Sequence, residues 1–245
     1  MFCTNIKSKT GFSSSLNLKE LRISPEKYRS NAIRNTDVLE DVLNIVASSV
    51  GSLTNPNKLS NSFKTLKNIN VAPNTIKEYL DYCIDSFLIQ KAYRYDVKGK
   101  KYIDTPLKYY FTDIGLRNIR LGFRQQEETH IMENIIYNEL ITRGYQVDVG
   151  VVEISEKNEN NNFVRKQLEV DFVCNLGYER IYIQSALNID DIVKKEQEEK
   201  SLIKIYDNFR KIIVVKENIR KWKDENGILI IGLKEFLTCP ESIYS

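Results

Sequence analysis

The sequence predicts a mixed α+β protein in which a helical N-terminal part is followed by a part of α/β type. Three short segments before residue 84 carry apolar residues at helical spacing. After residue 144, apolar runs of strand length are separated by turns that contain glycine or asparagine. A chain of 245 residues suits one large domain or two small ones. We therefore expect two domains, at residues 36–124 and 125–245, after a poorly defined segment at residues 1–35.

The composition restricts the class of protein. Hydrophobic residues make up 42% of the chain and charged residues 28%, as in globular proteins. No apolar run is long enough to cross a bilayer, and the N-terminus has no apolar signal-peptide core. The four cysteines are scattered and the only histidine is His130, which argues against a zinc site and favours reduced thiols. We therefore expect a cytoplasmic protein with no membrane partner.

The first predicted domain combines three helices with a hairpin. Thr36 is a good N-cap for the first helix, which ends near Gly51. The second and third helices are expected at residues 59–67 and 73–83. Two tyrosine-rich strands at residues 88–97 and 101–111 follow, joined by the turn Lys98-Gly99-Lys100. Residues 112–124 give a short helical connection.

Three helices and a basic hairpin describe a winged helix-turn-helix. Its third helix would face the major groove of DNA through Asn74, Thr75 and Lys77. Its hairpin would lie near phosphates through Arg94, Lys98, Lys100 and Lys101. The alternative is a docking or linking role, because Glu78 and Asp81 keep the third helix from being strongly cationic. A net charge of +3 also means that a nucleic-acid surface must be local.

The second predicted domain begins with a helix at residues 128–143, closed by Gly144. Glu133 lies at the edge of the apolar stripe of this helix, where it could reach a sheet. Glu139 lies nearer the middle of the stripe, which suggests a buried partner and makes it the second choice as a ligand. Strands are expected at residues 145–154, 167–175, 180–187, 211–215 and 228–231, and further helices at residues 190–206 and 233–237.

Two of these strands carry polar groups that could meet at one end of a sheet. Alternation in residues 167–175 places Glu169, Asp171 and Val173 on one face. The other face then carries Leu168, Val170, Phe172 and Cys174. In the next strand Tyr182, Gln184 and Ala186 share a face. Carboxylate and amide oxygens in this arrangement can hold a divalent metal, although acidic residues on a strand can also simply face water.

Glu133, Asp171 and the triplet Gln184-Ser185-Ala186 resemble the PD-(D/E)xK superfamily of restriction-endonuclease-like nucleases. The resemblance implies an αβββαβ domain in which Glu133, Asp171 and Gln184 hold Mg²⁺. It also implies a lysine that helps to activate water, and Ala186 stands at that position. A relocated lysine could come from Lys166, Lys194 or Lys195.

A wider resemblance runs from about residue 36 to the C-terminus. The phrases LEDVLNIVASSVGS, KYYFTDIGLRN, HIMENIIYNELITRGY, EVDFV and IYIQSAL occur in this order. Together they resemble the C-terminal half of prokaryotic AAA-family ATP-binding proteins of unknown function. Such proteins place a P-loop ATPase domain before the winged helix, and the motif G-x-x-x-x-G-K-[ST] does not occur in this sequence. The resemblance therefore implies an ATPase domain or subunit as a partner and no ATP site in this chain.

The predicted function follows from the altered motif. Glutamine in place of a carboxylate weakens metal binding, and loss of the lysine removes an electrostatic contribution to hydrolysis. We expect a nuclease-like domain that is inactive or strongly impaired and serves DNA recognition or assembly. The alternatives are an active Mg²⁺-dependent DNA endonuclease with a relocated lysine, and a docking module with no DNA contact. The first expectation requires that no ammonium group reaches the carboxylates.

Overall fold

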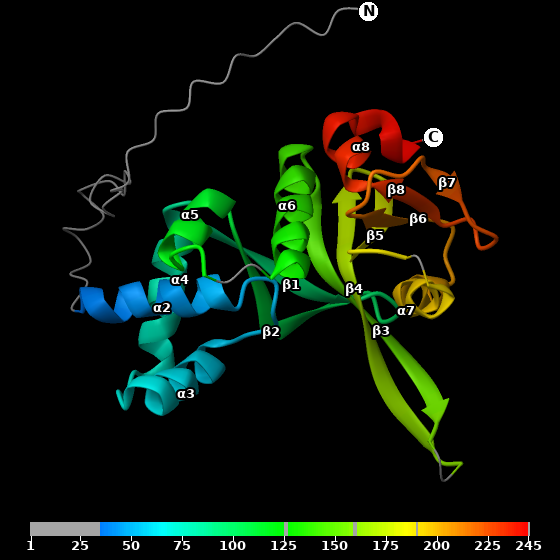
Figure 1. Ribbon diagram of the computed structural model, residues 1–245. Helices are drawn as coiled ribbons and strands as arrows, with labels where there is room; N and C mark the ends of the chain where they lie inside the picture. The colour runs from blue at the N-terminus through cyan, green and yellow to red at the C-terminus, as the bar shows by residue number, and fades with distance from the viewer. Residues whose placement is uncertain (1–34, 125–126, 159–160, 190, 245) are drawn as a thin grey trace, which may run out of the picture. The chain divides into compact units, whose positions relative to one another are not determined.

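The computed structural model describes residues 35–124, 127–158, 161–189 and 191–244. The segment predicted at residues 1–35 therefore lies outside the described residues, apart from Asn35. Residues 37–245 form one compact unit of mixed α+β structure (Figure 1).

The described residues contain seven α-helices, a short 3₁₀-helix and eight strands. The helices are α2 (Thr36–Ser48), α3 (Pro56–Lys67), α4 (Pro73–Asp85), α5 (Ile114–Arg120), α6 (Glu128–Thr142), α7 (Ile192–Ile203), α8 (Leu233–Thr238) and η1 (Pro240–Tyr244). The strands are β1 (Ile89–Asp96), β2 (Lys101–Phe111), β3 (Gln146–Lys157), β4 (Phe163–Leu176), β5 (Glu179–Ala186), β6 (Arg210–Val215), β7 (Trp222–Lys223) and β8 (Leu229–Gly232). Every helix and strand predicted from residue 36 onward is confirmed, and β7 and η1 were not predicted.

All eight strands belong to one mixed sheet, in the order β2-β1-β3-β4-β5-β6-β8-β7. The pairs β1–β2, β3–β4, β4–β5 and β7–β8 are antiparallel, and the other neighbours are parallel. Because β1 pairs with β3, the tyrosine-rich hairpin continues the sheet of the C-terminal part. The sheet therefore runs across the boundary that the sequence predicts at residue 124.

The β3–β4 hairpin is longer than its neighbours and projects from the sheet as a two-stranded ribbon (Figure 1, lower right). Pairing continues from Gln146–Asn175 to Lys157–Phe163. The tip residues 159 and 160 lie outside the described residues.

The predicted alternation along β4 holds as far as Asp171 and is wrong from Phe172 onward, because the strand contains a β-bulge. The register shifts between Asp148 and Gly150 of β3, which pair with Val173 and Val170. Two residues of β4, Asp171 and Phe172, therefore lie opposite the single residue Val149 of β3. Beyond this bulge, each side chain of β4 points to the face opposite to the one predicted. As a result Val170 and Val173 lie in one apolar cluster, whereas Phe172 faces the opposite side.

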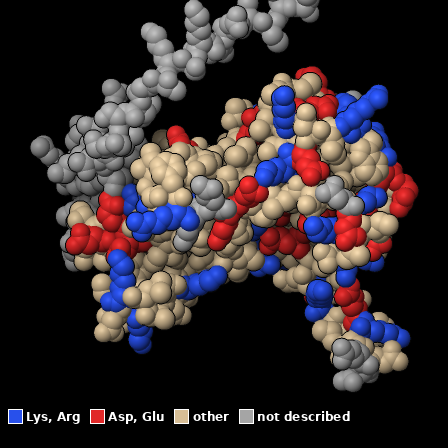
Figure 2. Space-filling view, viewed as in Figure 1, with Lys and Arg blue, Asp and Glu red and all other residues tan. Residues whose placement is uncertain are grey.

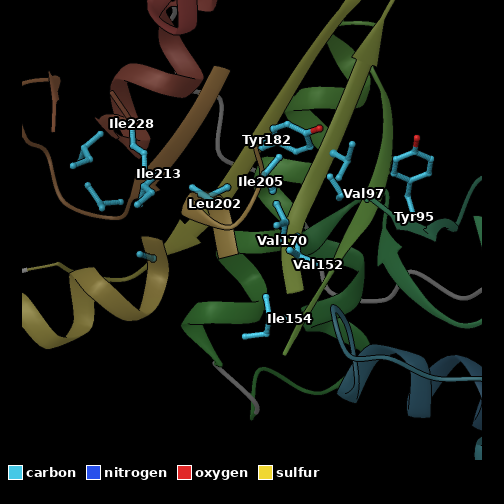
Figure 3. Close-up of a cluster of buried hydrophobic side chains, with 14 residues drawn as sticks. Tyr95, Val97, Val152, Ile154, Val170, Tyr182, Leu202, Ile205, Ile213 and Ile228 are labelled. Carbon is cyan, nitrogen blue, oxygen red and sulfur yellow. The ribbon is translucent and has the colours of Figure 1, made fainter. Parts of the chain in front are cut away.

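Helices α6 and α7 cover opposite faces of this part of the sheet. On the α7 face, Leu202 packs in the cluster with Val170, Tyr182 and Ile213 (Figure 3). On the α6 face, the Tyr137 ring stacks on Tyr110 of β2 with centroids 4.1 Å apart. The two faces therefore receive different side chains from the same strands, and the bulge in β4 decides which.

Candidate functional site

The α6 face contains a buried group of charged side chains centred on Lys108 of β2. Its ammonium nitrogen lies 2.8 Å from Glu133 Oε1 on α6 and 2.7 Å from Glu169 Oε1 on β4. The side chains of Lys108 and Glu133 are 4% and 5% exposed, and that of Glu169 is 37% exposed. The Tyr110 hydroxyl donates a second hydrogen bond to Glu133 Oε1 at 2.6 Å. We call Lys108, Tyr110, Glu133, Glu169 and Asp171 the carboxylate cluster.

Asp171 is held in this cluster by the neighbouring strand. The backbone amide and the hydroxyl of Ser185 both donate to Asp171 Oδ2, at 2.8 and 2.7 Å. Burial, and then the negative charge of Glu133, raise the pKa of Asp171 to about 7. Lys108 acts in the opposite direction on Asp171, but one ammonium group cannot neutralise three carboxylates.

Lys108 and Glu133 keep their ordinary charges. Burial lowers the pKa of Lys108, but Glu133, Asp171 and Glu169 together raise it above its usual value. The pKa of Glu133 is raised by burial, but hydrogen bonds from His130, Lys108 and Tyr110 and the charge of Lys108 bring it below its usual value. The cluster therefore contains a buried ion pair with additional negative charge beside it.

Contacts between α6 and the edge strand β2 fix the geometry of this ion pair. Asn134 is fully buried, and its amide accepts from Phe111 N and donates to Phe111 O, both at 2.8 Å. This pairing replaces the strand partner that an edge strand lacks. Asn134 follows Glu133 in α6, and Phe111 follows Tyr110 in β2. The two hydrogen bonds between Asn134 and Phe111 therefore hold the Glu133 carboxylate next to the Tyr110 hydroxyl.

Two of the three predicted metal ligands come together, and the third reaches them differently. Glu133 and Asp171 share the α6 face. Gln184 lies in β5 beside Glu198 of α7, which hydrogen-bonds to its side chain. The Gln184 amide oxygen accepts from the backbone N of Asp171 at 3.3 Å. Ser185, the middle residue of the triplet, is therefore the one that binds the Asp171 carboxylate.

The expectation that no ammonium group reaches the carboxylates is wrong, because Lys108 lies between two of them. Ala186, at the lysine position of the motif, packs in the apolar cluster of the α7 face. The suggested replacements lie elsewhere: Lys166 is exposed, Lys194 donates to Asn188, and Lys195 contacts Glu199. The ammonium group beside Glu133 and Glu169 is that of Lys108, in β2.

Glu139, the second choice as a ligand, is not part of the cluster. It is half-buried and pairs with Arg143 one turn along α6, with Nε and Oε1 2.8 Å apart. Arg143 is therefore the buried partner that the helical stripe suggested, because its side chain is 9% exposed and its guanidinium lies 4.4 Å from the ring centroid of Phe236.

Sequence reasoning missed Lys108, Tyr110, Glu169 and Ser185 as members of the site. A lysine inside the run Lys108-Tyr109-Tyr110-Phe111 was a usable signal, because an ammonium group in a buried strand requires a partner. Glu169 lies two residues before Asp171, on the face that alternation assigned to both. No local pattern indicated that β2 would lie against α6.

The arrangement does not form a metal site as it stands. Glu133 Oε1 and Asp171 Oδ2 each accept two hydrogen bonds from protein donors. Among the described residues there is no group of three or more His, Cys, Asp or Glu side chains that could hold a metal ion. A Mg²⁺ ion needs near-octahedral oxygen ligands, whereas Glu133 Oε1 contacts the Lys108 ammonium group and Asp171 Oδ2 is bound by Ser185.

The predicted DNA-contacting residues lie in two places. On α4, Asn74 and Lys77 are exposed and Thr75 is half-buried. In the hairpin, Lys100 and Lys101 are exposed. The other two are engaged: Arg94 donates to Gln167 Oε1 at 3.1 Å, and Lys98 donates to the Glu153 carbonyl at 2.8 Å.

Comparisons with known proteins show similarity to proteins without an assigned role. Residues 28–127 match the family model described as a domain of unknown function, DUF8612. The chain is 32% identical over 205 residues to an uncharacterized protein of Haemophilus influenzae, covering 84% of this chain and 47% of that protein. It is 28% identical over 168 residues to the uncharacterized protein MJ1544 of Methanocaldococcus jannaschii, covering 68% and 34%. The chain spans about half and a third of the length of these relatives.

A structural comparison finds the crystal structure of protein VC1899 from Vibrio cholerae. The TM-score is 0.26 and the sequence identity 14%, over 83% of this chain and 55% of that protein. A likeness of this size carries no argument. Within the described residues, no helix is long and apolar enough to cross a membrane.

Proposed function

We propose that the chain is a DNA-binding module of a longer AAA-family ATP-binding protein, in which a nuclease-like sheet serves recognition or assembly and does not hydrolyse DNA. The resemblance described above and the greater length of both relatives support the first part. The three helices α2–α4 and the β1–β2 hairpin, with Lys77, Lys100 and Lys101 exposed, support contact with DNA as a winged helix-turn-helix.

An ammonium group is present, contrary to the sequence-based expectation, so the proposal now depends on how it is used: Lys108 is held in an ion pair with Glu133 and Glu169. Both ends of the Lys108–Glu133 pair are buried, and Tyr110 and Ser185 satisfy further carboxylate oxygens. For a metal to replace this pair, these hydrogen bonds would first have to break. The Lys108 ammonium group would then remain in a buried site without a compensating charge. The cluster therefore fastens β2 to α6 and β4, and the amine in it is a structural partner of the carboxylates.

A plasmid-nicking assay with Mg²⁺ or Mn²⁺ tests the absence of hydrolysis. The wild-type protein should cleave no faster than Asp171→Ala, whose carboxylate is removed. Metal-dependent nicking by the wild type that disappears in Asp171→Ala would contradict the proposal.

Duplex binding as a function of salt tests the DNA contact. Affinity should fall as salt rises, because each phosphate contact releases counterions. Lys77→Ala together with Lys100→Ala should weaken binding. It should also reduce the slope of the logarithm of the binding constant against the logarithm of the salt concentration by roughly two, about one unit for each lost phosphate contact. Lys223→Ala is the matched control, since Lys223 is exposed on β7 at the other end of the sheet. Equal affinities for both variants would favour a docking module without DNA contact.

A second candidate is an active metal-dependent endonuclease in which Lys108 is the relocated lysine. It is favoured by the pKa of Asp171, raised to about 7 by burial and by Glu133, because the cluster holds more negative charge than Lys108 neutralises. Excess buried negative charge stabilises a bound cation. In that case nicking activity should be lost in both Asp171→Ala and Lys108→Met while duplex binding is retained.

A further inference from the structure

The α7 face of the sheet carries a continuous series of aromatic and cationic side chains that neither the carboxylate cluster nor α4 uses. Lys91 lies over the ring of Tyr93, with the nitrogen 5.4 Å from the centroid. The Tyr93 ring meets Tyr102 at 6.2 Å, and Tyr102 meets Tyr95 at 5.4 Å, both edge to face. These contacts connect β1 with the edge strand β2.

Arg180 of β5 extends the series across the sheet. Its guanidinium lies 4.9 Å from the ring centroid of Tyr95 and 5.8 Å from that of Phe209, which precedes β6. Asn175 accepts from Arg180 Nε at 2.8 Å, which fixes the orientation of the guanidinium. Tyr95 lies at the β1 end of the apolar cluster in Figure 3, so the series continues outward from the core.

The outer rings of the series are accessible. Tyr102 is 51% exposed, Phe209 42% and Tyr93 40%, whereas Tyr95 beneath them is 9% exposed. A sheet face of this kind presents ring surfaces that hold their positions, because their edges contact one another and a buried tyrosine supports them. Flat surfaces at fixed positions are suited to stacking by other flat groups.

A groove continues from this face along the projecting ribbon. It has a volume of about 680 Å³ and is lined by Tyr206, by three basic residues (Lys98, Arg165 and Lys204) and by three acidic ones (Asp96, Glu153 and Glu156). Tyr206 is 83% exposed, and the Lys98 nitrogen lies 5.6 Å from its ring centroid. Figure 2 shows Lys and Arg side chains mixed with acidic ones on the projecting ribbon.

Charge indicates what occupies this surface. Residues 89–104, which form most of the hairpin, contain five Lys and Arg and two Asp, a net charge of +3 that equals that of the whole chain. One of the two acids, Asp96, accepts from the backbone N of Gly99 and so belongs to the turn. A cationic hairpin therefore surrounds the exposed rings, and the complementary partner is a polyanion with flat groups.

We propose that the strip Lys91–Tyr93–Tyr102–Arg180–Phe209 and the adjoining groove bind single-stranded nucleic acid. Bases stack on the exposed tyrosine and phenylalanine rings, and phosphates contact Lys98, Lys100 and Lys101. The bases of a duplex are stacked on each other and cannot reach these rings, so the strip selects single strands. The inference goes beyond the proposed function and depends neither on α4 nor on the state of the carboxylate cluster.

Fluorescence anisotropy with labelled 20-nucleotide oligo-dT, oligo-U and a 20-base-pair duplex tests this proposal. The full chain should bind the single strands more tightly than the duplex at equal salt. The double variant Tyr93→Ala with Phe209→Ala should weaken single-strand binding at least about tenfold, as expected for loss of two stacking rings, and change duplex binding less than about twofold. Comparison of oligo-dT with oligo-U shows whether the 2′-hydroxyl contributes.

Two controls separate stacking from other effects. Tyr178→Ala removes a fully exposed tyrosine in the β4–β5 turn and should leave binding unchanged. Lys223→Ala removes an exposed cation of β7, at the other end of the sheet, and should also bind normally. Single-strand affinity that is absent in the wild type, or unchanged in the folded double variant, would overturn the proposal. Lys77→Ala on α4 should alter duplex binding alone, so failure of the duplex interaction is distinguishable.

Discussion

Two lysines in this chain each lie between two carboxylates, on opposite faces of one sheet. On the α6 face, Lys108 contacts Glu133 and Glu169 at 2.8 and 2.7 Å. On the α7 side, Lys195 contacts Glu199 at 3.1 Å and Asp224 at 4.0 Å. The charges are similar, but the elements that supply them differ.

Lys195 and Glu199 are one turn apart on α7, and Asp224 accepts from the backbone N of Asn226 and Ile228 in its own turn. The shorter of the two Lys195 contacts is therefore local, between residues one turn apart on α7. The carboxylate cluster, by contrast, takes its members from β2, α6 and β4, which are distant in sequence. A charge group whose members come from distant elements holds those elements together in the folded state. Substitutions in the two groups can therefore test this comparison.

The largest effect is expected for Lys108→Met, which leaves Glu133 buried without its cation. Removing one partner of a buried ion pair costs about 3–5 kcal/mol of folding free energy. Urea unfolding followed by circular dichroism measures this loss. The double variant Lys108→Met with Glu133→Leu should recover most of it, because both charges are then gone. A loss below 1 kcal/mol for Lys108→Met would show that the cluster does not connect these elements.

The next effect is a pH dependence caused by Asp171. Its pKa is about 7 in the folded protein and near 3.8 unfolded, so the folded state binds the proton more tightly. Its contribution to stability is therefore complete below about pH 4 and is lost as the pH rises to about 7. The stability of the wild type relative to Asp171→Asn should fall across this range, as measured by urea unfolding at several pH values. A difference that is independent of pH would contradict the raised pKa.

A third prediction concerns the bulge that distributes β4 between the two faces. A Cβ added at Gly150 would lie 2.8 Å from Val170 Cβ and from Val173 Cγ2. Gly150→Ala should therefore cost about 1–3 kcal/mol through overpacking. Thermal unfolding of Gly150→Ala and of Gly150→Ala with Val173→Ala provides the measurement. The second substitution relieves one of the two contacts, so equal destabilisation by the added methyl group in both backgrounds would argue against this cause.

The smallest effect is expected for Lys195→Met. Its side chain is 20% exposed, burial raises the pKa of Glu199, and Asp224 keeps two backbone hydrogen bonds. Glu199 can therefore take up a proton at little cost, and the loss should be about 1 kcal/mol or less. Urea unfolding of Lys195→Met and Lys108→Met under the same conditions compares the two losses of unfolding free energy directly. Similar losses for both lysines would remove the distinction between local and distant charge groups.

Secondary structure was predictable from the chain because its signals are local. The Pro73 start of α4, the Gly144 that follows α6 and the Lys98-Gly99-Lys100 turn each act within a few residues. The two-residue strand β7 was missed because so short an element has no periodicity. The alternation along β4 failed at the bulge because it depends on packing against Gly150 of another strand.

The candidate site was predictable in part for the same reason. Glu133 and Asp171 were found because each carries a local signal, on a helix edge and within a strand. Lys108 was not found, because its position depends on the pairing of β1 with β3, which brings the hairpin into the same sheet as β4. The prediction that no amine was present was based on Ala186, and the only replacements weighed were Lys166, Lys194 and Lys195.

By itself, the sequence determined which segments become helices and strands, and that two acidic side chains stand at sheet-facing positions. The tertiary structure alone decided that Lys108 lies between Glu133 and Glu169, and that aromatic and cationic side chains of β1, β2 and β5 form one strip. The physical reason is that hydrogen bonding within a helix or turn depends on neighbouring residues. The partner of a buried charge depends instead on which strand lies next to it in the folded sheet.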